Sequence, residues 1–207
     1  MTRHRYRSLL VSVLLFTTAC STESTSRNET VRAPLDAGGL RQKLVLIDGI
    51  GRIFSDDISY RSYFENPGFR ELYTHPYWHR SASIELWKTT DVSIEMKKLS
   101  VRLLQCLPLL EYVALMSAAF ADYKAGDVPA DVVETLISPG SNFGTHLGLA
   151  YRDTAVSSAL KNIANDAAAS AEMREQIAWI LTGKDAEFVR EYNLPSEPLP
   201  DISCTSP

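Results

Sequence analysis

Residues 92–120, VSIEMKKLSVRLLQCLPLLEYVALMSAAF, decide the fold class of this chain. Apolar residues recur through this stretch at the spacing of an α-helix, and the pattern ends at Gly126. The apolar stripe consists of Val92, Met96, Leu99, Leu103, Cys106, Leu110, Val113, Ser117 and Phe120. Pro108 lies inside the stripe, lacks an amide hydrogen and clashes with the carbonyl four residues earlier. We therefore predict a central helix with a kink or break near Leu104 to Leu107.

The same periodicity predicts further helices on both sides of this stretch. One helix begins near Leu40, a short one lies between 127–129 (DVP) and 138–140 (SPG), and several more follow, the last at Phe188 and Val189. Their apolar faces are Leu40, Leu44, Ile47, Ile50 and Phe54; Val156, Leu160, Ile163 and Ala167; and Met173, Ile177, Ile180 and Leu181. No two-residue alternation predicts a strand, and no internal repeat is detectable. We expect an all-α domain of about five to seven helices, spanning residues 39–194.

The amino terminus has the pattern of an export signal. Three arginines within residues 1–7 precede an apolar run, and Leu9 to Ala19 is 11 residues long. A helix that spans a bilayer needs about 20 residues, so a cleaved signal is favoured over a permanent span.

The apolar run ends in TTAC at residues 17–20, small residues that lead into a cysteine. Residues 1–21 here resemble the signal peptide and lipobox of bacterial lipoproteins, although Thr17 stands where that family usually has leucine. The resemblance implies removal of residues 1–19 and attachment of lipid, including fatty acyl chains such as palmitate, to Cys20. Because Ser21 follows, it also implies sorting to the outer membrane, facing the periplasm. The alternative is an ordinary secretory signal with an incidental cysteine at position 20.

Composition limits the partners of the remaining chain. Removing the three arginines of the signal leaves 18 Lys+Arg against 25 Asp+Glu, a formal net charge of −7. This balance disfavours nucleic acid and broad binding to anionic lipid. Residues 21–30 are polar and cannot form a core, so residues 20–38 are expected to be a flexible tether to the membrane.

The cysteine count indicates a disulfide. If Cys20 carries lipid, Cys106 and Cys204 remain, in a compartment where disulfides persist. A bond between them would fix the proline-rich tail, residues 195–207, to the helical domain. The alternative is a buried free Cys106 and an unpaired tail.

An aromatic-rich region between residues 60 and 87 is a candidate protein-binding surface. Tyr, Trp and Arg are enriched at interface hot spots. The residues proposed for this surface are Tyr63, Arg70, Tyr73, Tyr77, Trp78 and Trp87. The competing interpretation, which we favour, is that the rings close a small core between helices and hydrogen-bond at its rim.

Candidates for other chemistry lack their usual partners. His75 and His79 have helical metal-ligand spacing, but Pro76 interrupts the helix and no third ligand is evident. His146 lies in a glycine-containing segment that matches no phosphate loop. Glu111 among apolar neighbours, or the pair Asp56 and Asp57, would be acid–base candidates, and an ordinary solvated carboxylate is the simpler interpretation. We therefore predict no catalytic residue, metal or cofactor.

These observations lead to three functional hypotheses. The first is a non-catalytic envelope lipoprotein that binds another protein, in its most specific form an immunity-type inhibitor of a periplasmic toxic effector. This form rests on a general resemblance to such inhibitors in size, anchor and acidity. The second is an accessory lipoprotein that holds a larger envelope complex to its membrane. The third is an envelope enzyme with an unfamiliar site.

Overall fold

A computed structural model describes residues 33–51, 66–138, 146–184 and Cys204, and all of them belong to one compact unit, Arg32–Pro207. Within these ranges the chain forms α-helices and no strand, which confirms the all-α prediction. Eight helices have eight or more residues, and a ninth has four, so the described part alone exceeds the expected five to seven. The predicted signal segment, Cys20, most of the predicted tether, and residues 185–203 lie outside the described residues.

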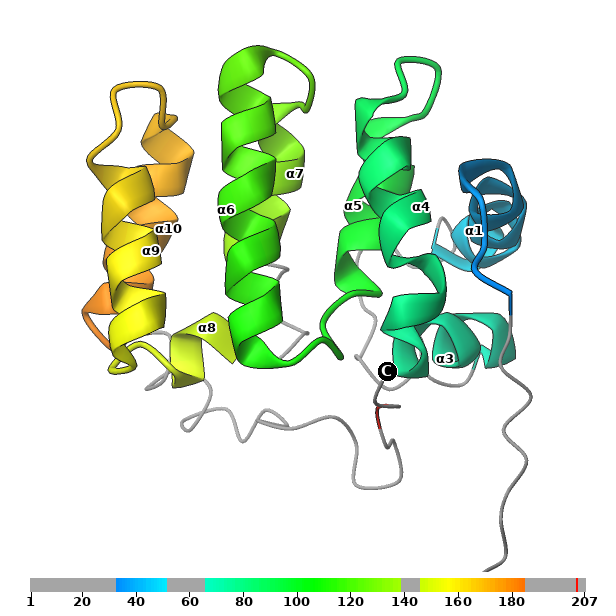
Figure 1. Ribbon diagram of the computed structural model, residues 1–207, viewed down its shortest axis with the longest axis horizontal. Coiled ribbons are helices and arrows are strands. Elements are labelled where there is room, and N and C mark those ends of the chain that lie inside the picture. Colours follow the sequence, from blue (N-terminus) through cyan, green and yellow to red (C-terminus); the bar gives the residue numbers. More distant parts are fainter. Residues whose placement is uncertain (1–32, 52–65, 139–145, 185–203, 205–207) are drawn as a thin grey trace, which may run out of the picture. The chain divides into compact units, whose positions relative to one another are not determined.

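Three helical hairpins follow one another along the chain (Figure 1). They pair α4 (Pro76–Lys88) with α5 (Ile94–Arg102), α6 (Leu109–Ala125) with α7 (Ala130–Ile137), and α9 (Thr154–Ala164) with α10 (Ala171–Leu181). The second helices form a contacting row α5–α7–α10, and α6 contacts α9 in the other row. Short connections between consecutive helices favour this antiparallel pairing.

The remaining helices attach to this array. The helices α1 (Ala37–Gly51) and α3 (Pro67–Thr74) pack against α4, α1 also contacts α5, and the four-residue α8 (His146–Leu149) contacts α10. Thus α1 and α3 extend the first hairpin, and the other two hairpins form the opposite side of the array (Figure 1).

The buried apolar residues form two clusters. The first core cluster belongs to α1, α3, α4 and α5 and comprises Leu40, Leu44, Ile47, Phe69, Leu72, Tyr73, Ala82, Leu86, Val92, Met96, Leu99, Leu103 and Cys106. The second core cluster lies between the later hairpins and includes Trp87, Leu104, Tyr112, Met116, Val133, Leu136, Leu160, Met173 and Ile177. The turn between α5 and α6 supplies residues to both clusters, so it joins them.

The folded part begins earlier than the predicted position 39. The Leu35 amide donates to the Trp78 carbonyl at 2.9 Å, and the Trp78 indole donates to the Ala33 carbonyl at 2.7 Å. The Asp36 carboxylate accepts from the Gly39 amide at 2.6 Å, as a residue that caps a helix does. Residues 33–38 therefore contact the helical domain, and α1 begins two residues before the predicted boundary at residue 39.

The break at Pro108 is confirmed: α5 ends at Arg102 and α6 begins at Leu109. The predicted apolar stripe continues across it only in part: Val113 and Phe120 of α6 are buried, but two other stripe residues are not. Leu110 is 63 % exposed, and Ser117 is also exposed. These two residues were predicted to face the core, and that part of the prediction is wrong.

Local signals set the other helix ends. Asp153 caps α9 by accepting from the amides of Ala155 and Val156, and Ser170 caps α10 by accepting from the amide of Met173. At the end of α6, Gly126 adopts φ +85°, which lets the Asp127 amide donate to the Asp122 carbonyl.

The two cysteines expected to pair are adjacent. The sulfur atoms of Cys106 and Cys204 lie at disulfide distance, and their Cα atoms are 5.6 Å apart although the residues are 98 positions apart in sequence. Cys204 packs against the first core cluster, so the end of the chain returns to the α5–α6 turn.

Candidate functional site

Two of the aromatic residues proposed for a binding surface are buried inside the domain. Trp87 is 1 % exposed and Tyr73 is 2 % exposed, and each is part of a core cluster. The Trp87 indole donates to Ser100 Oγ at 2.8 Å, so its polar atom is satisfied inside the domain. Burial makes both side chains inaccessible, which corrects the docking-surface prediction for Tyr73 and Trp87 and supports the core interpretation.

The other proposed residues that the structure describes lie on α3 and α4. Arg70 is exposed on α3, and Tyr63 lies outside the described residues. Trp78 is half-buried, with Lys43 Nζ 4.9 Å from its ring centroid and its indole bonded to Ala33. Trp78 therefore holds the start of the domain against α4.

Tyr77, Arg80 and Glu111 form a polar contact between α4 and α6. The Tyr77 hydroxyl donates to Glu111 Oε1 at 2.8 Å, and Arg80 Nη1 lies 2.9 Å from Glu111 Oε2. Partial burial, and then the hydrogen bond to the Glu111 carboxylate, raise the pKa of Tyr77. Both carboxylate oxygens of Glu111 have partners on α4, so this contact connects two hairpins.

The two histidines with metal-ligand spacing occupy different environments. His75 lies between α3 and α4, whereas His79 is fully buried in α4. The His79 ring contacts the Leu72 carbonyl through Nε2 at 2.9 Å and Ser83 Oγ through Nδ1 at 3.1 Å. Because a carbonyl only accepts, Nε2 carries the hydrogen and Nδ1 accepts from the Ser83 hydroxyl. Burial lowers the pKa of His79 to about 4.

The structure describes only some of the remaining chemical candidates. Asp56 and Asp57 lie outside the described residues, and His146 is the first residue of α8. Within the described ranges, no three His, Cys, Asp or Glu side chains gather as metal ligands would. No helix in the described part combines the length and the hydrophobicity needed to cross a membrane.

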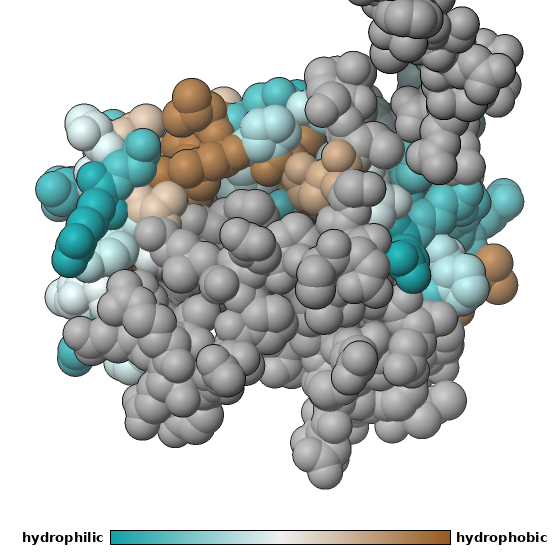
Figure 2. All heavy atoms as spheres, turned by 90° about the horizontal axis from the view of Figure 1, so that it is seen from below, coloured by the Kyte–Doolittle hydropathy of each residue, from teal (hydrophilic) through white to brown (hydrophobic). Residues whose placement is uncertain are grey.

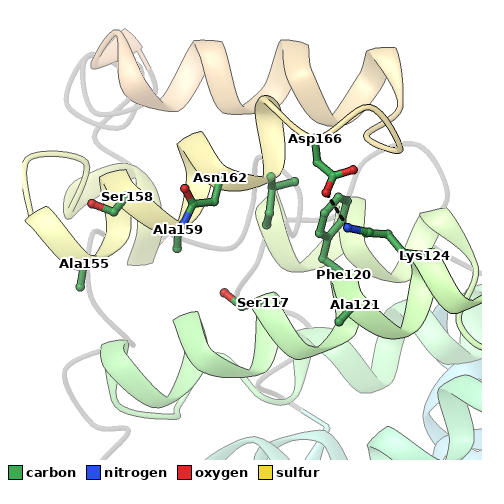
Figure 3. Close-up of a pocket in the computed structure, with 10 residues that line it drawn as sticks. Ser117, Phe120, Ala121, Lys124, Ala155, Ser158, Ala159, Asn162 and Asp166 are labelled. Carbon is green, nitrogen blue, oxygen red and sulfur yellow. Dashed lines mark hydrogen bonds and ion pairs between the residues drawn. The ribbon is translucent and has the colours of Figure 1, made fainter.

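A groove between α6 and α9 is a candidate binding site in the part of the chain that the structure describes. It has a volume of about 440 Å³, within the range typical of ligand sites. Its lining residues are Ser117, Phe120, Ala121 and Lys124 from α6, Ala155, Ser158, Ala159, Asn162 and Ile163 from α9, and Asp166 just beyond α9. Figure 3 shows Ser117 and Phe120 of α6 and Asn162 of α9 pointing toward the space between the two helices.

Apolar residues form the floor of the groove and small residues form its walls. Phe120 is 7 % exposed and Ile163 is 3 % exposed, so both belong to the core as well as to the floor. The wall residues Ala121, Ala155 and Ser158 are exposed, which makes this a surface groove and not an enclosed cavity. Short side chains on both walls leave space into which another molecule can insert apolar groups.

An ion pair closes one end of the groove. Lys124 Nζ donates to Asp166 Oδ2 at 2.6 Å and lies 5.7 Å from the Phe120 ring centroid (Figure 3). The Lys124 hydrogen bond, and then the Ala168 amide, lower the pKa of Asp166, so the carboxylate stays charged and neutralises the lysine. Tyr123 also joins α6 to this region by donating to the Ala168 carbonyl at 3.1 Å.

The chemistry of the groove suits binding. Its only charged side chains are Lys124 and Asp166, which pair with each other. The Ser117 hydroxyl donates to the Val113 carbonyl of its own helix at 3.0 Å, so no base within the groove activates it. Ser158 and Asn162 add hydrogen-bonding capacity along one wall.

Exposed apolar surface also occurs away from the groove. The large apolar residues with the greatest exposure in the described part are Val45, Leu46, Leu110 and Trp179. Figure 2 shows that apolar residues gather into a patch on the face seen from below.

Comparison with known proteins assigns no relationship: no family model, no curated protein and no solved structure matches the chain.

Proposed function

We propose that this chain is a lipid-anchored protein of the bacterial envelope that acts by binding another protein, without catalysis. The observation that carries the proposal is the α6–α9 groove, with its apolar floor, small walls and internally neutralised charge. The lipid on Cys20 would hold the domain close to the membrane where its partner acts.

Charge defines the chemistry of the partner segment. A charged side chain inserted into the groove would lose hydration, and the paired Lys124 and Asp166 would give it no free counter-charge. The inserted side chains are therefore uncharged and mainly aliphatic. An amphipathic helix laid along α6 and α9 presents such a row of side chains, as in other helix-in-groove complexes.

Filling the groove tests this proposal. Ala121→Trp places an indole on one exposed wall, and Ala118→Trp places the same ring on the same helix outside the groove lining. We expect affinity purification from membranes of the native host to recover the same partner with the wild type and Ala118→Trp. In Ala121→Trp the added ring occupies the space that the partner would fill, so recovery of the partner should fall by about tenfold or more. A tenfold fall in affinity corresponds to a loss of about 1.4 kcal/mol in binding free energy.

Two outcomes would contradict the proposal. One is equal recovery of the partner by the wild type and by Ala121→Trp. The other is that no protein is recovered while the purified chain degrades an envelope polymer. If the recovered partner is toxic in the envelope and co-expression of this chain restores growth, the function is of the immunity type. A complex that fails to assemble without this chain would instead indicate an accessory role.

A further inference from the structure

The bond between Cys106 and Cys204 connects the turn between α5 and α6 to a segment that follows the last described helix, α10. Cys106 is 7 % exposed and lies in the α5–α6 turn, next to Leu104 and Leu107, which belong to the other core cluster. Cys204 is half-buried against the first core cluster and lies three residues before Pro207. The 98-residue separation between the cysteines includes every helix from α6 to α10.

This arrangement restricts when the bond can form. Because Cys204 follows Cys106 by 98 positions, the loop cannot close until the chain through Cys204, with every helix from α6 to α10, has been synthesised and exported. Closing a long loop also removes much conformational entropy from the unfolded chain, which stabilises the folded chain relative to it. The bond thus adds stability late and only under oxidising conditions.

We propose that the Cys106–Cys204 disulfide is a redox lock. While both cysteines are reduced, in a reducing compartment, the domain is only weakly stable, and formation of the bond after export stabilises it. The compartment in this proposal rests on the proposed envelope location, whereas the lock itself is independent of the binding groove. Cys204 is the entry thiol, since it retains exposed surface while Cys106 is buried.

The reaction is thiol–disulfide exchange with a disulfide oxidant. The Cys204 thiolate attacks the oxidant and forms a mixed disulfide, with release of one oxidant thiolate. The Cys106 thiolate then attacks Cys204 Sγ, which forms the internal bond and releases the second oxidant thiolate. The protein loses two electrons and two protons, and the oxidant is reduced to a dithiol or to two thiols.

Equilibrium unfolding with and without reductant tests the lock. The chain from residue 20 onward, carrying Cys20→Ser, should be folded in both states. For a loop of this length, reduction should raise the unfolding equilibrium constant on the order of a thousandfold. Cys204→Ser should behave like the reduced chain and should not respond to reductant. Equal stability of the oxidised and reduced chains would overturn the proposal, and because no partner is present, it would leave the proposed binding function unaffected.

Two further measurements test the compartment and the entry thiol. The peptides containing residues 106 and 204 should be joined in chains exported with residues 1–19, and should carry free thiols in chains made without them. With oxidised glutathione, Cys106→Ala should form a mixed disulfide at Cys204 on the order of tenfold faster than Cys204→Ser forms one at Cys106. Free thiols in the exported chain, or equal rates in the two variants, would contradict the proposal.

Discussion

Replacing Trp87 with alanine is expected to lower the free energy of unfolding by about 3–5 kcal/mol, the usual cost of removing a large buried ring. Trp87 is 1 % exposed in the second core cluster, while its neighbour Leu86 lies in the first. The substitution leaves a cavity where α4 bridges the two clusters. It also removes the hydrogen bond from the indole to Ser100 Oγ. Urea unfolding followed by far-ultraviolet circular dichroism measures the change without relying on tryptophan fluorescence.

Trp179→Ala provides a matched control, because Trp179 is 46 % exposed on α10. Its cost should stay within about 0.5 kcal/mol, as for most surface substitutions. Ser100→Ala should cost about 1–3 kcal/mol, since it leaves the buried indole N–H without its acceptor. If Trp87→Ala were no more destabilising than Trp179→Ala, the assignment of Trp87 to the core would be wrong.

Acidification from pH 7 to pH 4 is expected to cost about 3 kcal/mol of stability through His79 alone. Burial lowers its pKa to about 4 in the folded chain, whereas an unfolded histidine titrates near pH 6.5. Between these values the unfolded chain binds more protons than the folded chain, so stability falls as the pH falls. Below the folded-state pKa the loss is complete. Each unit of pKa difference corresponds to about 1.4 kcal/mol.

His79→Gln isolates this contribution from those of the carboxylates. Glutamine does not titrate, so the unfolding free energy of the His79→Gln variant should depend less steeply on pH between 6.5 and 4 than that of the wild type. Ser83→Ala removes the hydroxyl partner of His79 Nδ1 but keeps the ring, so the wild-type pH slope should remain. Denaturant unfolding at intervals of half a pH unit measures these slopes. Identical slopes for the wild type and His79→Gln would show that His79 is not held neutral by the fold.

Local sequence signals predicted most of the helical framework. Pro108 marked the break between α5 and α6, and Pro129 and Ser138 marked the limits of α7. The spacing of Val156, Leu160 and Ile163 identified the buried face of α9. Each of these features depends on residues that are close together in the sequence, so the local sequence pattern predicts it.

Features that depend on the phase of a helix or on contacts between distant segments were missed. The apolar stripe placed Leu110 and Ser117 in the core, but a helix that restarts after proline need not keep the orientation of the helix before it. The aromatic residues gave no indication of which rings were buried, because that depends on how α3, α4 and α5 pack. The groove was also missed, since α6 and α9 meet only in the folded chain. Small residues four apart on both helices, Ser117 and Ala121 on α6 and Ala155 and Ala159 on α9, were its one visible signal.

Photo-cross-linking from the groove measures partner binding most directly. A photoreactive residue at Ser158 lies on a groove wall, and one at Thr90, also exposed, lies in the α4–α5 connection outside the groove lining. In the native host, the Ser158 position should form a covalent adduct with one defined envelope protein, and Ala121→Trp in the same chain should lower the yield of that adduct by about tenfold or more. The Thr90 position should form none with that protein. An adduct from Thr90 but none from Ser158, or an adduct from Ser158 whose yield Ala121→Trp leaves unchanged, would contradict binding through the α6–α9 groove.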